Sequence, residues 1–420
     1  MICVHCMVSP ALKKFVVGHG YTGLCNYCGK TDLSVEDSKL MECIEALFHT
    51  VLVPFDDLPH MTQAHLECGA DLAIGDIWNH LESHPPTSAE EFNQKLCDFL
   101  ECEFIDKHAN RSRKDLFMIN YGDDTDNEFE AGWENFISSV AHGHRFFNRQ
   151  AKSFLDDLFH ILTDDYNLEN KGIIQTIDST TPIFRARIAA SKDILKKIQE
   201  APESELGPTP HQLASDQRMS PAGISVFYGA LDRQTCISEI RPLVGDSAVS
   251  GEFRTLTKLR LIDLNKLSSC NFKNDIYDDE FVRHAHAVAF FKEMAFQMSR
   301  PARRGNSNPY LATQVIFEYL RVKFKDNADG VIYQSVQQDQ SGACLALFPE
   351  SSLISPISAC SIQDDDVFAF EKEPLYSLFY VPESLRYHRV RGVSYMQEED
   401  DSDFKLTSGI NLQKYMGTRF

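Results

Sequence analysis

A chain of 420 residues is too long for one ordinary compact domain, so we expect two or three. Its hydrophobic content of 43% is typical of globular proteins, whereas a net charge of -20 argues against broad nucleic-acid binding, which needs a basic surface. No apolar run reaches the roughly 18 residues that a bilayer span needs, and the N-terminus has no secretory signal pattern. We therefore expect a cytoplasmic protein that does not bind membranes or, broadly, nucleic acid; a local basic site and a basic protein partner stay open.

The first 32 residues contain two CxxC pairs, Cys3 with Cys6 and Cys25 with Cys28. The spacing C-x2-C-x18-C-x2-C is that of zinc ribbons and knuckles, in which each pair brings two thiolates to one tetrahedral ion. Four unrelated buried thiols are the alternative, and two such pairs within thirty residues make it the weaker one. Because four cysteines close the coordination sphere, the pattern predicts a structural zinc ion rather than a catalytic one.

Residues 33–170 are predicted to form a helical domain. Apolar residues at Leu40, Ile44, Leu47 and Phe48 follow the helical repeat, and similar stripes continue to about residue 165. The histidines of this region invite a metal or nuclease interpretation, but no arginine precedes a histidine at the Arg-x4–6-His spacing of some helical nucleases. We therefore interpret His142, His144 and His160 as surface or packing residues.

Residues 178–350 have a mixed pattern that predicts a second, α+β domain. Strands are expected at 224–231, 253–264, 330–337 and 343–348, and helices at 232–242, 278–299 and 310–324, the first of them capped by Asp232. The elements do not alternate regularly, so a simple βαβ fold is not expected.

Residues 351–420 are predicted to form a C-terminal extension. Acidic clusters at 364–366 and 398–403 are expected to be solvated loops, and the segment 377–396 between them has strand character. A local basic stretch lies at 299–306.

One constellation in the α+β region has the residue types that a dinucleotide needs. Arg218 precedes a predicted strand, Tyr228 lies near its end, and Glu239 follows in the next helix; Arg185 and Ser335 lie at other predicted strands. Arginine forms paired hydrogen bonds with phosphate oxygens, and tyrosine stacks on a cationic ring. A carboxylate stabilises the oxocarbenium-like transition state of a sugar. Arg, Tyr and Glu are common residues, so composition alone does not establish a binding site. A buried strand tyrosine and two solvent-exposed charged side chains would give the same pattern.

The stretch "RMSPAGISVFYGALDRQTCISEIRP", with "GVIYQSVQ" and "ACLALF", resembles the RES domain family over residues 178–350. The family's motif arginine, tyrosine, glutamate and serine correspond to Arg218, Tyr228, Glu239 and Ser335, and Phe184-Arg185 resembles an early motif element. Met219 and Ser220 depart from the usual tryptophan and asparagine, which affects local packing more than the polar set. Members include toxins of RES–Xre toxin–antitoxin pairs, whose fold is similar to that of ADP-ribosyltransferases and which deplete NAD.

The resemblance implies an NAD-consuming enzyme that cleaves the nicotinamide–ribose bond, as a glycohydrolase or a phosphorylase, with an antitoxin as a possible partner. Arg185, Arg218 and Tyr228 would bind NAD, Glu239 would orient the ribose and stabilise positive charge, and Ser335 would order Glu239 or bind the ribose. Two alternatives stay open: an ADP-ribosyltransferase that modifies a macromolecule, and a non-catalytic module that binds a nucleotide or partner.

The N-terminal layout resembles that of longer RES proteins, in which a cysteine-rich knuckle and a HEPN-like helical region precede the RES domain. The resemblance rests on "WENF" and "HRFF" and on the order of the segments. Because the Arg-x4–6-His pair is missing, it does not imply ribonuclease activity.

Overall fold

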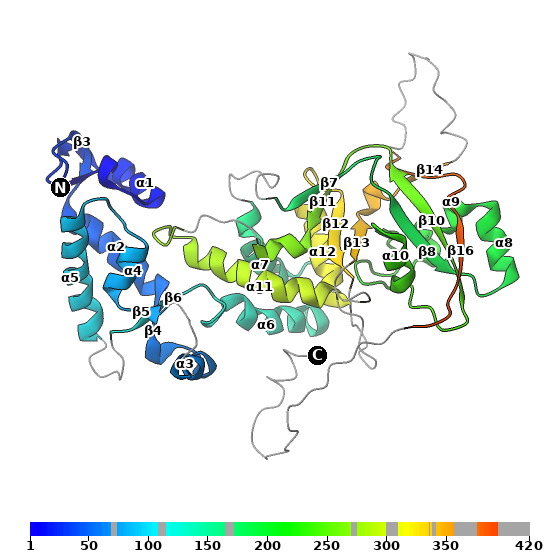
Figure 1. Ribbon diagram of the computed structural model, residues 1–420, viewed down its shortest axis with the longest axis horizontal. Helices are drawn as coiled ribbons and strands as arrows, with labels where there is room; N and C mark the ends of the chain where they lie inside the picture. Colours follow the sequence, from blue (N-terminus) through cyan, green and yellow to red (C-terminus); the bar gives the residue numbers. More distant parts are fainter. Residues whose placement is uncertain are drawn as a thin grey trace, which may run out of the picture.

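The computed structural model describes residues 1–68, 74–107, 115–163, 172–269, 275–299, 310–335, 337, 342–356 and 376–393. The molecule is elongated, with the N-terminal elements at one end, the large sheet at the other and the long helix α11 (Phe281–Ser299) between them (Figure 1). The predicted acidic clusters at 364–366 and 398–403 and nearly all of the basic stretch at 299–306 lie outside the described residues. Among the described helices, none combines the length and apolar character needed to cross a membrane.

The N-terminal segment is a small three-stranded sheet with one helix. The strand order is β1-β3-β2, and both pairings are antiparallel. Helix α1 begins after Ser9, whose hydroxyl accepts a hydrogen bond from the Leu12 amide, and Pro10 occupies the first helical position, where its missing N–H costs nothing. The elements are β1 (Ile2–Cys3), η1 (Val4–Cys6), α1 (Pro10–His19), β2 (Tyr21–Leu24) and β3 (Thr31–Val35).

The next part is mainly helical, as predicted, but it also contains a small sheet, β4-β6-β5, that the helical stripe did not predict. Its strands are two or three residues long, too short for a period-2 pattern to be recognised. The elements are α2 (Asp37–Val51), β4 (Leu52–Pro54), η2 (Phe55–Asp57), α3 (His60–Glu67), β5 (Ile74–Gly75), α4 (Ile77–Ser83), α5 (Glu90–Lys107) and β6 (Phe117–Ile119).

One hydrophobic core joins these first 119 residues to the segment that leads into α11. It includes Phe48, Phe92 and Phe117 together with Tyr277 and Phe281. The Asp275 carboxylate accepts hydrogen bonds from the Ser9 hydroxyl and from the Ala11 amide at the start of α1. The beginning of α11 is therefore anchored in the N-terminal part.

Four helices cover one face of the large sheet: α6 (Glu128–His142), α7 (Arg149–Leu158), α11 and α12 (Leu311–Lys323). Phe136, Leu155, Phe291 and Phe317 share a core with strand residues such as Val331. Helices α6 and α7 lie within the predicted helical region, yet they pack against the sheet. The short helix η3 (His160–Leu162) follows α7 and contacts α11.

The large sheet has the order β14-β15-β10-β8-β9-β13-β12-β11-β7, with β16 also paired to β10. Its second face packs on α8 (Lys192–Glu200) through residues such as Ile198. The mixed α+β class is thus confirmed. The remaining elements are β7 (Ile174–Ile177), β8 (Ile183–Ile188), α9 (Pro202–Glu205), η4 (His211–Leu213), β9 (Phe227–Ala230), α10 (Arg233–Glu239), β10 (Ser247–Thr255), β11 (Leu259–Asp263), η5 (Leu264–Ser269), β12 (Gly330–Gln334), β13 (Ala343–Leu347), η7 (Pro349–Ser351), β14 (Ile354–Ser355), β15 (Leu378–Tyr380) and β16 (Arg386–Arg389).

Strands β8 and β9 divide this sheet into two halves. They pair at a single position, Phe184 with Ala230, whereas β8 follows β10 from Ile183 to Ile188 and β9 follows β13 along its whole length. Beyond Phe184 the two strands separate. Two predicted site residues, Arg185 on β8 and Tyr228 on β9, lie close to the position where this pairing ends.

Candidate functional site at the sheet divergence

Arg185 is the first residue of β8 after the pairing with β9 ends. Its guanidinium carbon lies 5.1 Å from the centre of the Phe227 ring, within the range of a cation–π contact. Burial lowers the pKa of Arg185 to about 10, with the neighbouring Tyr228 opposing and Arg187 reinforcing the shift, so the side chain stays charged at neutral pH. The structure therefore places a half-buried cation, with a buried Nη1, at the point of divergence.

Arg218 lies in the loop before β9, and helix α12 holds that loop in place. The Thr313 hydroxyl donates a hydrogen bond to the Arg218 carbonyl at 2.5 Å, and the side-chain Nε2 of Gln314 donates one to the Gln217 carbonyl at 2.8 Å. The Arg218 guanidinium carbon lies 5.6 Å from the centre of the Tyr333 ring. The main chain and the side chain are thus both fixed by elements distant in sequence.

Both arginines have an unsatisfied buried donor. Within the described part of the chain, neither Nη1 of Arg185 nor Nη1 of Arg218 has a hydrogen-bond acceptor. A buried donor without an acceptor costs about 1–3 kcal/mol, and more when it is charged. Buried cationic N–H groups of this kind favour an anionic ligand such as a phosphate group.

Tyr228 is held by its hydroxyl group. The Met219 amide donates to the Tyr228 oxygen at 3.0 Å, and the Ser220 hydroxyl lies 3.1 Å from it. Burial raises the pKa of Tyr228, although these hydrogen bonds and the charges of Arg185 and Arg218 act in the opposite direction. Met219 and Ser220, where the sequence departs from the family motif, therefore orient the tyrosine.

Glu239 and Ser335 are in direct contact. Asp232 caps α10 by accepting a hydrogen bond from the Thr235 amide, as predicted, and the helix ends at Glu239. The fully buried Ser335, just after β12, donates its hydroxyl to Oε1 of Glu239 at 2.5 Å. This hydrogen bond fixes the carboxylate in one orientation.

A glycine allows α10 to approach the strand that follows Ser335. A Cβ atom on Gly342 would lie 2.1 Å from the Thr235 hydroxyl oxygen, well inside contact distance. The Gly342 carbonyl also accepts a hydrogen bond from the Ser335 amide. Any larger residue at 342 would displace α10 and with it Glu239.

Tyr333 is a site residue that the sequence analysis missed. The Arg218 guanidinium lies over its ring. Burial raises the pKa of Tyr333 far above the usual value, Cys344, Glu239 and Tyr228 reinforce the shift, and Arg218 opposes it. Tyr333 therefore packs against one of the predicted residues, Arg218. Its position in β12, two residues before Ser335, is the signal that identifies it, because alternate residues of an extended chain lie on the same face.

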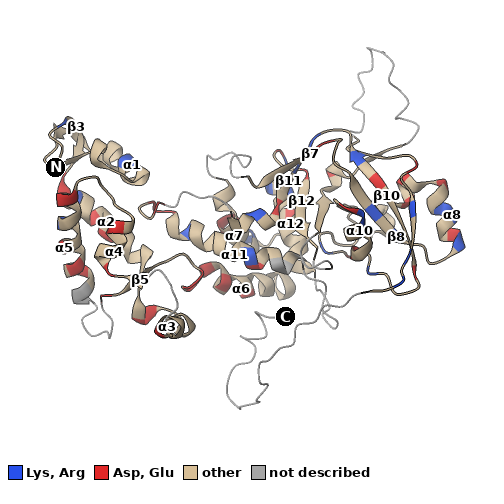
Figure 2. Ribbon diagram, viewed as in Figure 1, with Lys and Arg blue, Asp and Glu red and all other residues tan. Residues whose placement is uncertain are grey.

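Acidic and basic residues both lie near the site. Strand β8 contains Arg185 and Arg187, and the neighbouring strand β10 contains Glu252 and Arg254 (Figure 2). On β8, for example, Arg187 forms an exposed ion pair with Glu205. The buried Nη1 donors of Arg185 and Arg218 are thus a local feature of this site.

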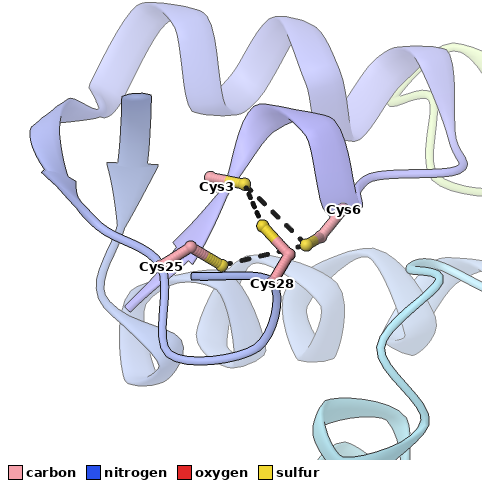
Figure 3. Close-up of side chains that lie close together, drawn as sticks. All are labelled: Cys3, Cys6, Cys25 and Cys28. Atoms are coloured by element: carbon pink, nitrogen blue, oxygen red, sulfur yellow. Dashed lines mark hydrogen bonds between the residues drawn. The ribbon is translucent and has the colours of Figure 1, made fainter. Parts of the chain in front are cut away.

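The four N-terminal cysteines form a separate, second candidate site. Their sulfur atoms all lie within 4.8 Å of one another and point toward a common centre (Figure 3). The Sγ distances are 3.8 Å for Cys3–Cys6, 3.4 Å for Cys3–Cys28 and 3.8 Å for Cys6–Cys25. A tetrahedral zinc ion with Zn–S bonds of about 2.3 Å requires sulfur atoms about 3.8 Å apart, so the four residues fit a metal ion.

The turn of the second cysteine pair orients its thiol groups. Gly29 adopts a left-handed conformation with φ of 70°, and its amide donates to the Cys25 carbonyl. Burial opposes ionisation of Cys25, but the backbone amides of Cys28 and Tyr27 outweigh it and lower the pKa to about 6. Burial raises the pKa of Cys3 and Cys6.

Residues 184–362 match the family model described as the RES domain. The matched segment contains Arg185, Arg218, Tyr228, Glu239 and Ser335, so the site at the sheet divergence lies within the segment that matches the RES domain. A search of curated proteins found no match to the chain. The predicted domain was 178–350, and the match begins and ends slightly later.

Proposed function

We propose that this RES domain consumes NAD by cleaving its nicotinamide–ribose bond. Arg185 and Arg218 bind the diphosphate, Tyr228 stacks on the nicotinamide, and Glu239 contacts the ribose. The contact between Ser335 and Glu239, next to two buried arginine donors that have no acceptor in the described structure, carries the proposal. These two features support a site with one oriented carboxylate for the ribose and two cationic donors for the diphosphate.

The proposed reaction requires few protein groups beyond these residues. The bond between C1′ of the ribose and the pyridinium nitrogen breaks, and its electron pair leaves with nicotinamide as a neutral molecule. The sugar then carries positive charge, which a carboxylate stabilises by Coulombic attraction. Water or phosphate next forms a bond to C1′ and loses a proton. Because the leaving group is neutral, no general acid is needed for its departure.

The direct test is NAD turnover by the purified full-length chain, with identification of the products. Water as acceptor yields ADP-ribose, and phosphate yields its 1-phosphate. ADP-ribose attached to a protein or nucleic acid identifies the alternative, a transferase. If NAD binds but is not consumed with any of these acceptors, the domain is a binding module and the proposed reaction is wrong.

Removing either arginine should weaken NAD binding. Losing one charged hydrogen bond to phosphate costs about 1.5–3 kcal/mol, so R218Q and R185Q should each raise KM for NAD about 10- to 100-fold. Arg187, two residues along β8 but exposed and paired with Glu205, is the matched control. An R187Q variant as weak as R185Q would show a general charge effect and contradict the assigned contacts.

We further propose that Cys3, Cys6, Cys25 and Cys28 hold a structural zinc ion, which supplies a fixed crosslink between the two CxxC segments. Cys3, Cys6 and Cys25 are buried in the N-terminal core, so the ion would stabilise the packing of that core. The HEPN-like assignment of the helical region, the domain limits, and control by an antitoxin remain predictions from the family resemblance.

A further inference from the structure

A third cluster of ligating side chains lies away from both sites. His160, Glu280 and His284 each offer one ligand atom, and these atoms lie within 4.8 Å of one another. All three residues are half-buried. The sequence analysis interpreted His160 as a surface or packing residue and assigned no role to the other two.

The fold brings these residues together from two distant segments. The His284 amide donates to the Glu280 carbonyl at 2.9 Å, so both belong to the first turn of α11 and their side chains share one face. His160 begins η3, directly after α7, which lies along α11 (Figure 1). The imidazole rings of His160 and His284 are stacked, with centres 6.1 Å apart and planes inclined by 25°.

Two imidazoles and one carboxylate form a ligand set with defined metal preferences. Neutral imidazole suits zinc and other late divalent metals, and His2Glu with water in the fourth position is a known zinc coordination. Calcium and magnesium prefer oxygen ligands, so they fit this set poorly. The ligand set therefore favours zinc and other late divalent metals over calcium and magnesium.

The surrounding charges favour a cation in spite of one nearby arginine. Nη2 of Arg283 donates to Asp157 at 2.5 Å, whereas Nη1 reaches Oε2 of Glu280 only at 3.4 Å. Arg283 thus pairs mainly with Asp157. The Glu280 carboxylate has a second oxygen that can still bind a metal ion. Further acidic groups lie nearby, Asp278 beside His284 and Glu128 at the acidic start of α6 (Figure 2).

We propose that His160, Glu280 and His284 bind one zinc ion, with water as the fourth ligand, and that this ion ties η3 to the start of α11. The bound ion fixes two segments that are 120 positions apart in the chain, so it stabilises the junction between the helices that cover the sheet and the N-terminal part. The site is independent of the cysteine cluster and of NAD.

The test measures zinc content of the metal-loaded full-length protein after dialysis against a weak chelator. H160A and H284A should each hold one zinc equivalent fewer than the wild type, whatever the occupancy of the cysteines. Cobalt in this site should show a nitrogen–oxygen spectrum without a thiolate charge-transfer band. His144, exposed and at the end of α6, gives the matched control H144A, which should keep the wild-type content.

The variant E280Q tests the site without disturbing the packing, because glutamine has the same shape as glutamate but lacks its charge. It should weaken zinc binding at this site at least tenfold while its circular dichroism stays that of the wild type. Equal zinc content in the wild type, H284A and H160A would overturn the proposal, as would an equal loss in H144A. If a histidine variant fails to fold, the zinc affinity of E280Q decides, and an unchanged affinity rejects the site.

Discussion

Replacing Glu239 with glutamine should reduce kcat for NAD cleavage by at least about 100-fold, the usual cost of removing a group that stabilises charge in a transition state. The amide oxygen can still accept the hydrogen bond that Ser335 donates at 2.5 Å, so the local packing is kept. Because the carboxylate acts mainly on the developing sugar cation, KM should change much less than kcat. Initial rates measured over a range of NAD concentrations separate the two.

The control is Glu200, an exposed glutamate at the end of α8 in the same domain, whose only described ion pair is a surface contact with Lys196. E200Q should retain full activity. The variant S335A should lose less activity than E239Q, since it frees the carboxylate without removing it. Activity of E239Q near the wild-type level, with NAD consumed by the wild type, would contradict the role assigned to Glu239.

Replacing Cys25 with serine should abolish metal binding by the cysteine cluster and unfold the N-terminal core. Structural zinc sites contribute roughly 10–16 kcal/mol of apparent binding free energy at neutral pH, more than most domains have as net stability. Calorimetry should show the transition of the N-terminal core lowered or lost, with the transition of the large sheet retained. C68S, at an exposed cysteine outside the cluster, should behave as the wild type. Metal-free protein with an unchanged transition would show that the cysteines are merely packed.

The same site should respond to pH in a defined direction. Zinc binds thiolates, and burial raises the pKa of Cys3 and Cys6, so these groups must lose protons when the ion binds. Zinc loading near neutral pH should therefore release protons, and acidification should release the metal because the thiols regain them. Proton release is measured with a pH indicator in weak buffer, and none on zinc addition would contradict thiolate ligation.

Local patterns predicted those features that depend on neighbouring residues. The start of α10 followed from Asp232, whose carboxylate caps the helix whatever lies around it. The two CxxC pairs predicted the cysteine cluster, since each pair forms within a single turn. The resemblance to RES proteins selected Arg218, Tyr228, Glu239 and Ser335, and the structure brings Ser335 onto Glu239; their functional roles remain predictions.

The amino-acid sequence by itself determined most helices, the cysteine cluster and the match of the α+β region to the RES domain, because each depends on short-range periodicity, capping or motif spacing. Only the tertiary structure decided that Tyr333 lies beneath Arg218, that α6 and α7 pack on the large sheet, and that His160 meets Glu280 and His284. These contacts join residues about 115 to 200 positions apart. Such pairings are set by the burial of whole faces of helices and sheets, which no local pattern encodes.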